Sequence, residues 1–148
     1  MTDQMRRELP IAYSIHQPEE PFSPVDEVFR FTQLTRFSNV PGEAGHLLEG
    51  QRYGFESLSF IIAETHPGAG SPLHTHPYEE ANIVLEGIAT YVLGDQRFTV
   101  AGPYVVKIPA GVPHTFLNIG DRAFYRIDVF PDKQLRCDER GANPLLER

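Results

Sequence analysis

Residues 67–80 read Pro67-Gly-Ala-Gly-Ser-Pro-Leu-His74-Thr-His76-Pro-Tyr-Glu-Glu80, so a turn-forming stretch is followed by two closely spaced histidines. Side chains two positions apart lie on the same face of a β-strand, so His74 and His76 are expected to point to one side. Imidazole nitrogens suit divalent transition metals, and Glu80 adds a carboxylate from the same hairpin. The stretch therefore predicts a partial metal site, with His74, His76 and Glu80 as ligands carried by β-structure.

A fourth ligand has to come from elsewhere in the chain, and His114 is the candidate. It begins a predicted strand directly after Pro109-Ala-Gly-Val-Pro113, a turn of a kind that sets the direction of the next side chain. Three imidazoles and one carboxylate leave about two positions open on an octahedral ion. We therefore expect a reactive metal site rather than a closed structural one.

The rest of the chain has the pattern of an all-β protein. Its 148 residues suit one domain, and 13 prolines and 12 glycines beside 41% hydrophobic residues favour short elements joined by turns. Turns are predicted at Glu86-Gly87 and Gly94-Asp95, and a loop over residues 39–50. About eight segments have strand-like patterns. They are residues 28–37, 58–64, 81–85, 88–93, 97–100, 104–108, 115–118 and 124–130.

Three regions are expected along the chain. Residues 1–27 carry four prolines among acidic residues and are predicted to form an extended N-terminal arm. Residues 28–131 hold the predicted strands and form the barrel. Residues 132–148 form a charged C-terminal tail, where a short helix over residues 132–140 is one interpretation.

Composition excludes several classes of partner. The formal charge of −7 disfavours a nucleic acid, and no apolar run follows the charged N-terminal residues to act as a signal or membrane anchor. Cys137 is the single cysteine, so an internal disulfide and a multi-thiolate zinc site are both excluded. We expect a soluble cytoplasmic protein.

Residues 68–87 resemble the first motif of the cupin superfamily. That motif is a glycine, five residues, His-x-His, three residues, a glutamate, six residues and a glycine, and every fixed position is filled, from Gly68 to Gly87. Residues 109–118 are similar to the second motif, with proline, glycine, histidine and asparagine in register. The leading glycine of that motif is displaced, because Pro103 occupies its position and Gly102 precedes it.

The resemblance implies a double-stranded β-helix, a jelly-roll-like barrel, with one divalent metal at its wide end. The implied ligands agree with those expected from the residues alone: His74, His76, Glu80 and His114. Ligand types do not choose among iron, manganese, nickel, copper and zinc, although two adjacent open positions favour iron or manganese. Glu79 is interpreted as a rim group that orients a ligand.

Period-two counting predicts which side chains surround the metal. Phe116 and Asn118 share the face of His114, and Asn82 shares the face of Glu80. Phe60 and Ile62 are expected to line the barrel as a dry wall. In the last strand, hydrophobic pattern alone would leave Arg126 and Asp128 in solvent. A polar cavity would reverse this orientation, and Arg126 would then bind a substrate carboxylate.

The favoured function is a metal-dependent enzyme, most simply a dioxygenase-type oxidoreductase acting on a small organic molecule. Glu80 would tune the metal, and Glu79 or Tyr78 would move protons near the rim. One alternative is a non-catalytic cupin that binds or senses a small molecule. Another is a metal-dependent isomerase or cyclase, and an isomerase would need a base such as His66. A homodimer is expected from the proline-rich arm and from outward-facing apolar residues such as Ile83 and Val105.

Overall fold

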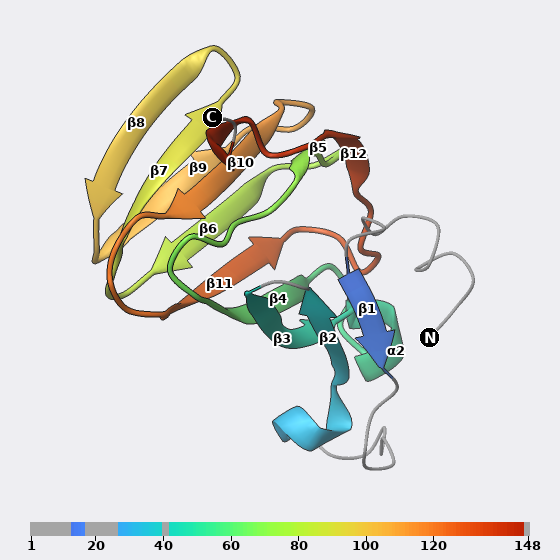
Figure 1. The fold of residues 1–148 in the computed structure, drawn as a ribbon. Helices are drawn as coiled ribbons and strands as arrows, with labels where there is room; N and C mark the ends of the chain where they lie inside the picture. The colour runs from blue at the N-terminus through green and yellow to red at the C-terminus, as the bar shows by residue number, and fades with distance from the viewer. Residues whose placement is uncertain (1–12, 17–26, 40–41, 147–148) are drawn as a thin grey trace.

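The computed structural model describes residues 13–16, 27–39 and 42–146, which form two antiparallel β-sheets around a common interior (Figure 1). In order across the first sheet stand β1 (Tyr13–His16), β2 (Thr35–Asn39), β3 (Glu43–Leu48), β4 (Ser59–Thr65), β11 (Phe124–Phe130), β6 (Glu80–Val84) and β9 (Tyr104–Ile108). In order across the second stand β12 (Asp138–Gly141), β5 (Leu73–Thr75), β10 (His114–Asn118), β7 (Ile88–Leu93) and β8 (Gln96–Ala101).

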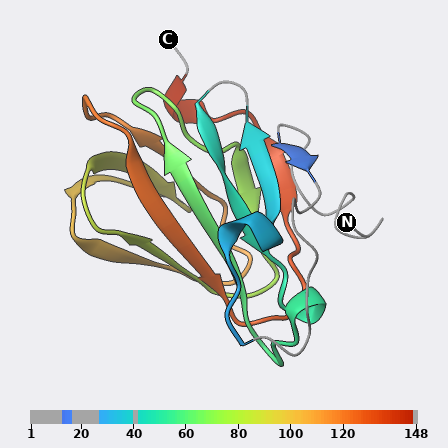
Figure 2. The same cartoon turned by 90° about the horizontal axis from the view of Figure 1, so that it is seen from below.

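Helical structure is a minor part of the described residues. It consists of the one-turn helix α2 (Gly50–Tyr53) and of 3-10 turns at Phe31–Gln33 and Pro144–Leu146. None of these helices is long and apolar enough to cross a membrane. The all-β architecture expected from the sequence is confirmed, and Figure 2 shows the two sheets curving around their shared interior.

Two clusters of buried residues fill the space between the sheets. One is built from Phe37, Leu47, Ala63, Tyr78, Phe130 and Leu135. The other is built from Val84, Ala89, Tyr91, Val106, Ile108, Phe116 and Phe124. Members of both clusters line one cavity, so the interior is divided by a pocket rather than packed throughout. A third, smaller cluster around Leu34, Leu48 and Tyr53 includes Phe60.

The predicted loop over residues 39–50 is wrong, because β3 spans Glu43–Leu48 and pairs with β2 and β4. Its strand pattern is hidden in the sequence. The inward positions include Glu43, which is 1% exposed and paired with Arg126, so a charged residue occupies a core position. Gly45 allows close approach of the strands, since a Cβ there would lie 2.2 Å from the carbonyl oxygen of Ile62.

The strand predicted over residues 28–37 is only partly correct, since Phe31–Gln33 is a 3-10 turn and β2 begins at Thr35. The helix considered for residues 132–140 is absent, and Asp138–Gly141 pairs with β5 as strand β12. Every residue of β12 is exposed, so no hydrophobic alternation could reveal the strand. Main-chain hydrogen bonding to the edge of β5 forms this strand without a buried face.

The N-terminal arm predicted for residues 1–27 lies mostly outside the described residues. The described part, β1, pairs antiparallel with β2 at the edge of the first sheet. At the other end, the tail after residue 131 joins the same two-sheet unit, because Leu135 is buried in the core and β12 extends the second sheet.

Candidate metal centre

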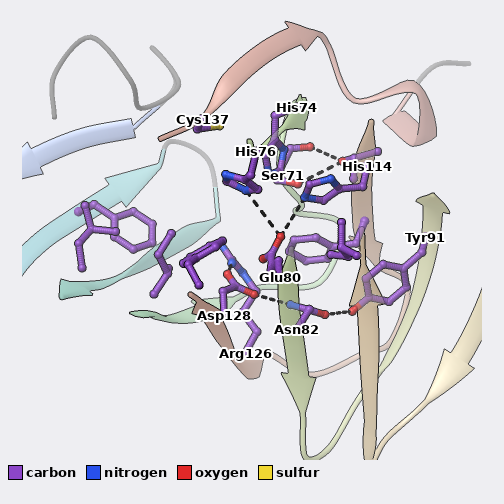
Figure 3. Close-up of a pocket in the computed structure, with 17 residues that line it drawn as sticks. Ser71, His74, His76, Glu80, Asn82, Tyr91, His114, Arg126, Asp128 and Cys137 are labelled. Carbon is purple, nitrogen blue, oxygen red and sulfur yellow. Dashed lines mark hydrogen bonds and ion pairs between the residues drawn. The ribbon is translucent and has the colours of Figure 1, made fainter. Parts of the chain in front are cut away.

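The four side chains expected to bind a metal lie together at one end of the cavity. His74 lies on β5 beside His114 at the start of β10, and these two residues are paired across the strands. Glu80 begins β6, and His76 lies in the connection just before it. One donor atom from each side chain lies within 4.8 Å of the others, an arrangement that could hold one metal ion. Figure 3 shows the group converging above Glu80.

Backbone carbonyls set the orientation of all three imidazole rings. The Nδ1 atom of His74 lies 2.7 Å from the carbonyl oxygen of Pro72, and that of His114 lies 2.9 Å from that of Val112. The Nδ1 atom of His76 lies 2.6 Å from the carbonyl oxygen of Arg136. A carbonyl can only accept, so Nδ1 carries the proton and Nε2 keeps its lone pair. This is the tautomer that a metal ligand requires.

Two buried polar atoms at the centre of this group have no hydrogen-bond partner among the residues that the structure describes. They are Oε2 of Glu80 and Nε2 of His114, which lie 3.0 Å apart. The Nε2 atom of His76 lies 3.6 Å from the same carboxylate oxygen. Buried polar atoms without partners are rare in folded proteins, and a shared cation would satisfy both. The residues present therefore fit a bound divalent metal.

The pKa shifts of His74, His76 and Glu80 all favour the protonation states of metal ligands. Burial, with the neighbouring imidazoles of His114 and His76, lowers the pKa of His74 to about 3. Burial also lowers the pKa of His76. Burial favours the neutral form of Glu80, but the adjacent imidazoles, that of His114 foremost, outweigh it and lower the pKa of Glu80. Neutral imidazoles beside an ionised carboxylate are the forms that bind metal.

The cavity next to these ligands has largely apolar walls. Its apolar lining consists of Phe37, Leu47, Ile61, Ile108, Phe116 and Phe130. Its polar lining beyond the four ligands consists of Ser71, Asn82, Tyr91, Thr115, Arg126, Asp128 and Cys137. Burial raises the pKa of the Cys137 thiol.

A hydrogen-bonded network crosses the floor of the cavity. Arg126 pairs with Asp128 on one side and with Glu43 on the other, where NH2 and Oε1 lie 2.9 Å apart. Asn82 donates from Nδ2 to Asp128 Oδ1 at 2.5 Å and accepts from the hydroxyl of Tyr91 at 2.6 Å. Figure 3 shows this line running below Glu80.

Three of the residues predicted to bind substrate line the cavity: Asn82, Phe116 and Arg126. The polar-cavity orientation of the last strand is the one observed, since Arg126 is 5% exposed and Tyr125 is 64% exposed. Hydrophobic pattern alone gave the opposite orientation. Asn118 shares the face of His114 but is not in the cavity lining. Its side chain instead forms hydrogen bonds with the backbone of Thr65, Arg122 and Gly120, so it supports the main chain rather than contacting a ligand.

The expectation that Phe60 and Ile62 line the cavity is wrong. Ile61 lines it instead, and the side chains of β4 alternate so that Ser59, Ala63 and Thr65 are the buried ones. Phe60 packs on the third cluster beside Phe55, at 5.8 Å between ring centroids. The third cluster covers part of the outer face of β4, so both faces of this strand carry apolar residues. The apolar character of a residue therefore could not show which face points inward.

Two side chains expected near the rim, Glu79 and Tyr78, are absent from the cavity lining. Glu79 is exposed in the turn before β6. Tyr78 packs in the core, and its hydroxyl accepts from the amide of Arg136 at 2.6 Å. The same hydroxyl lies 3.1 Å from the carbonyl oxygen of Gln134. Neither residue lines the cavity, so the geometry does not support the proton-transfer roles considered for them.

The sequence reasoning missed several lining residues. Tyr91 could have been found, because Ala89 and Tyr91 alternate in phase on the strand predicted over residues 88–93. Ser71 and Thr115 carry no pattern that separates them from other small polar residues. Cys137 reaches the cavity only through the pairing of the tail with β5, and no local signal predicts that pairing.

Residues 61–130 match the cupin domain family. Similar solved structures include oxalate decarboxylase from Bacillus subtilis at pH 4.6, 20% identical with a TM-score of 0.62 over 67% of this chain. A structure described by the Mn(II) centres of the same enzyme is 19% identical, with a TM-score of 0.64 over 68% of this chain. No curated protein sequence matches this chain.

The match identifies residues 61–130 as a cupin domain, and the two-sheet barrel has the cupin fold. The part that matches spans 28% and 29% of the two oxalate decarboxylase chains, and identity at this level shows the fold alone.

Proposed function

We propose that this chain is a metal-dependent enzyme that acts on a small organic molecule at the centre formed by His74, His76, Glu80 and His114. The favoured reaction is dioxygen chemistry at bound iron or manganese. The observation that carries the proposal is the convergence of three Nε2 lone pairs and one carboxylate on a buried point.

The donor set supports this choice of metals. Imidazole and carboxylate ligands that leave about two octahedral positions open are typical of non-haem iron and of manganese centres. When bound, the metal would supply a Lewis-acid or redox centre with places for dioxygen and substrate. The carbonyls of Pro72, Val112 and Arg136 would hold the rings in place during any exchange of ligands.

The cavity walls define what the chain itself contributes. Ile108, Phe116 and Phe130 exclude water beside the ligands and leave an apolar surface for the body of the substrate. Asn82, bonded to both Asp128 and Tyr91, fixes the polar side of the same space. The chain therefore orients a mainly apolar molecule toward the metal.

An isomerase is less well supported, because it requires a base near the substrate. His66, the base considered for that reaction, is exposed and lies 3.2 Å from Glu64. It does not line the cavity. Of the carboxylates that do, Asp128 is bonded to Arg126 and Asn82, and Glu80 belongs to the metal centre.

The test combines metal analysis of the purified protein with oxygen uptake. Protein loaded with Fe(II) or Mn(II) should consume oxygen with at least one member of a panel of phenols, diketones and thiols. Metal-free protein should consume none. Retention of metal without uptake on any compound would contradict the oxygen chemistry.

A small molecule that co-purifies with the protein can be used to test the alternative function, a cupin that binds without turnover. The molecule is incubated with the metal-loaded protein and then analysed by mass spectrometry. A ligand that returns unchanged would indicate a binding or sensing cupin, and a ligand that returns altered would support the enzyme.

A further inference from the structure

The buried arginine of the cavity is held between two carboxylates. Arg126 donates from Nε to Glu43 Oε1 at 3.0 Å, and its NH1 bonds Asp128 Oδ2. All three side chains are at most 5% exposed. The guanidinium also lies over the ring of Phe116, at 5.2 Å from its centroid. The guanidinium of Arg126 is therefore already bonded to Glu43 and Asp128, so these carboxylates would compete with an anionic substrate group for it.

Hydrogen-bond donors surround both carboxylates. Glu43 Oε1 accepts from Arg126 and from the hydroxyl of Thr65 at 2.9 Å. Asp128 accepts from Asn82 on one oxygen and from Arg126 on the other. The hydroxyl of Tyr91 donates to Asn82 Oδ1, which turns the amide nitrogen of Asn82 toward Asp128. Counted at their formal charges, the three residues Arg126, Glu43 and Asp128 carry one net negative charge.

The charge of this group affects which substrates can bind at the metal centre. A divalent ion and Arg126 would together supply three positive charges, and Glu43, Asp128 and Glu80 cancel them. Among the cavity-lining residues in the described part of the chain, Arg126 is the only arginine or lysine. An added carboxylate would thus enter a buried site without a compensating charge, which is strongly unfavourable.

We propose that Glu43 and Asp128 determine substrate specificity by cancelling the charge of Arg126, so that the centre selects an uncharged molecule. That molecule has an apolar or aromatic body and a metal-binding oxygen, as in phenols and enols, and carboxylates such as oxalate are rejected. The inference rests on the proposed function, because it concerns molecules that reach the metal. It separates this chain from the oxalate decarboxylases whose fold it shares.

The experiment compares two probes of nearly equal size and shape. Salicylate is an anion and salicylamide is neutral at pH 7, and oxalate serves as a second anion. Dissociation constants are measured by calorimetry on Mn(II)-loaded protein without oxygen, so that no turnover is needed. The variants are Asp128→Asn and Glu43→Gln, each of which removes one negative charge from the group. Glu64→Gln on the outer face of β4 is the control.

The expected result is that each cavity variant tightens salicylate and oxalate binding about tenfold relative to salicylamide. Glu64→Gln should leave the ratio unchanged. The intrinsic affinity of each probe for manganese cancels in this comparison. Melting curves establish which variants fold, and either cavity variant alone suffices for the test.

Two results would overturn the inference. One is an unchanged ratio in a folded cavity variant, and the other is an equal change of the ratio in Glu64→Gln. Metal content is measured first in every sample. Failure of the unmodified protein to retain manganese would overturn the proposed function and this inference together, whereas retention without discrimination overturns the inference alone.

Discussion

At the scale of single residues, Glu80 is the only negatively charged member of the metal centre. Its carboxylate is buried, and one oxygen lies within 3.6 Å of the Nε2 atoms of His76 and His114. It also follows directly after Glu79, which is exposed. Two adjacent glutamates in opposite environments provide a matched pair of substitutions.

Glu80→Gln should abolish tight metal binding, while Glu79→Gln should not. The amide of glutamine cannot supply negative charge, so the affinity for manganese should fall by more than about 100-fold, beyond the effect of losing an outer-shell partner. Calorimetric titration with Mn(II) measures both variants. Equal loss of affinity in Glu79→Gln would show that the exposed carboxylate is also needed.

A second residue-scale prediction concerns Gly87, in the turn between β6 and β7. Its φ is +119°, and a Cβ there would lie 2.6 Å from Cδ2 of Phe124. Gly87→Ala should therefore reduce the free energy of unfolding by more than about 2 kcal/mol, through strain and overpacking. Urea denaturation measures the loss.

Gly111→Ala is the comparison for Gly87. Gly111 has a φ of +75°, but a Cβ there meets nothing within 4 Å. Its loss should be about 1 kcal/mol, from backbone conformation alone. A loss at Gly111 equal to that at Gly87 would mean that the contact with Phe124 is unimportant.

At the scale of elements, the C-terminal tail supports the metal centre without providing a ligand. The carbonyl oxygen of Arg136 accepts from His76, and the hydroxyl of Tyr78 bonds the amide and carbonyl of the same residue. Leu135 is buried, and its amide donates to Glu49 at 3.1 Å. Tyr78 is thus a positioning residue that holds the tail against His76.

Tyr78→Phe should lower the metal affinity about tenfold, because the carbonyl that orients His76 would lose one of its anchors. The ring and its packing in the core remain. Calorimetry with Mn(II) gives the affinity, and urea denaturation of the metal-free protein reports on stability. Tyr125→Phe on the exposed face of β11 is the control.

A purely structural role for Tyr78 makes a different prediction. Stability would then fall in the metal-free protein while the affinity for Mn(II) stayed the same. The two measurements together therefore distinguish positioning of His76 from general support of the core.

At the scale of the whole molecule, an apolar row crosses the outer face of the first sheet. Ile62, Ile127, Ile83 and Val105 are cross-strand neighbours in register on β4, β11, β6 and β9. Val105 is 63% exposed and nearby Leu85 is 65% exposed. Ile62, Ile127 and Ile83 are partly buried, and an outer face that combines partly buried and exposed apolar side chains is typical of protein interfaces.

We expect the protein to form a homodimer through this row. Light scattering should give a mass of two chains, and Val105→Lys should shift the mass toward one chain because it places a charge in the interface. Thr99→Lys, on the exposed face of β8, should have no effect. A one-chain mass for the unmodified protein would refute the expectation.

Metal binding should also stabilise the whole fold. A metal present at 100 times its dissociation constant adds about 2.7 kcal/mol to the free energy of unfolding. For a chain of 148 residues this predicts that chelation lowers the Tm by roughly 5–10 °C. Calorimetry with and without EDTA measures the change, and an unchanged Tm would indicate that no metal is bound.

The sequence by itself determined the four donors that the structure gathers and most of the strands that position them. His74 on β5 and His76 just after that strand are two residues apart in the chain, and turns with proline or glycine precede Glu80 and His114. These relations act over a few residues, so they can be read from the chain. The turns at Glu86-Gly87 and Gly94-Asp95 are where the sequence predicted them.

Only the tertiary structure decided which face of a strand points inward in two situations. One is a strand whose two faces are both covered, and the other is a strand that buries a charged side chain. Phe60 and Ile61 are equally apolar, and packing of the third cluster on the outer face of β4 selects between them. Arg126 turns inward because Glu43, 83 residues away in the chain, neutralises it. Such compensation depends on distant partners, so no local pattern in the sequence could carry it.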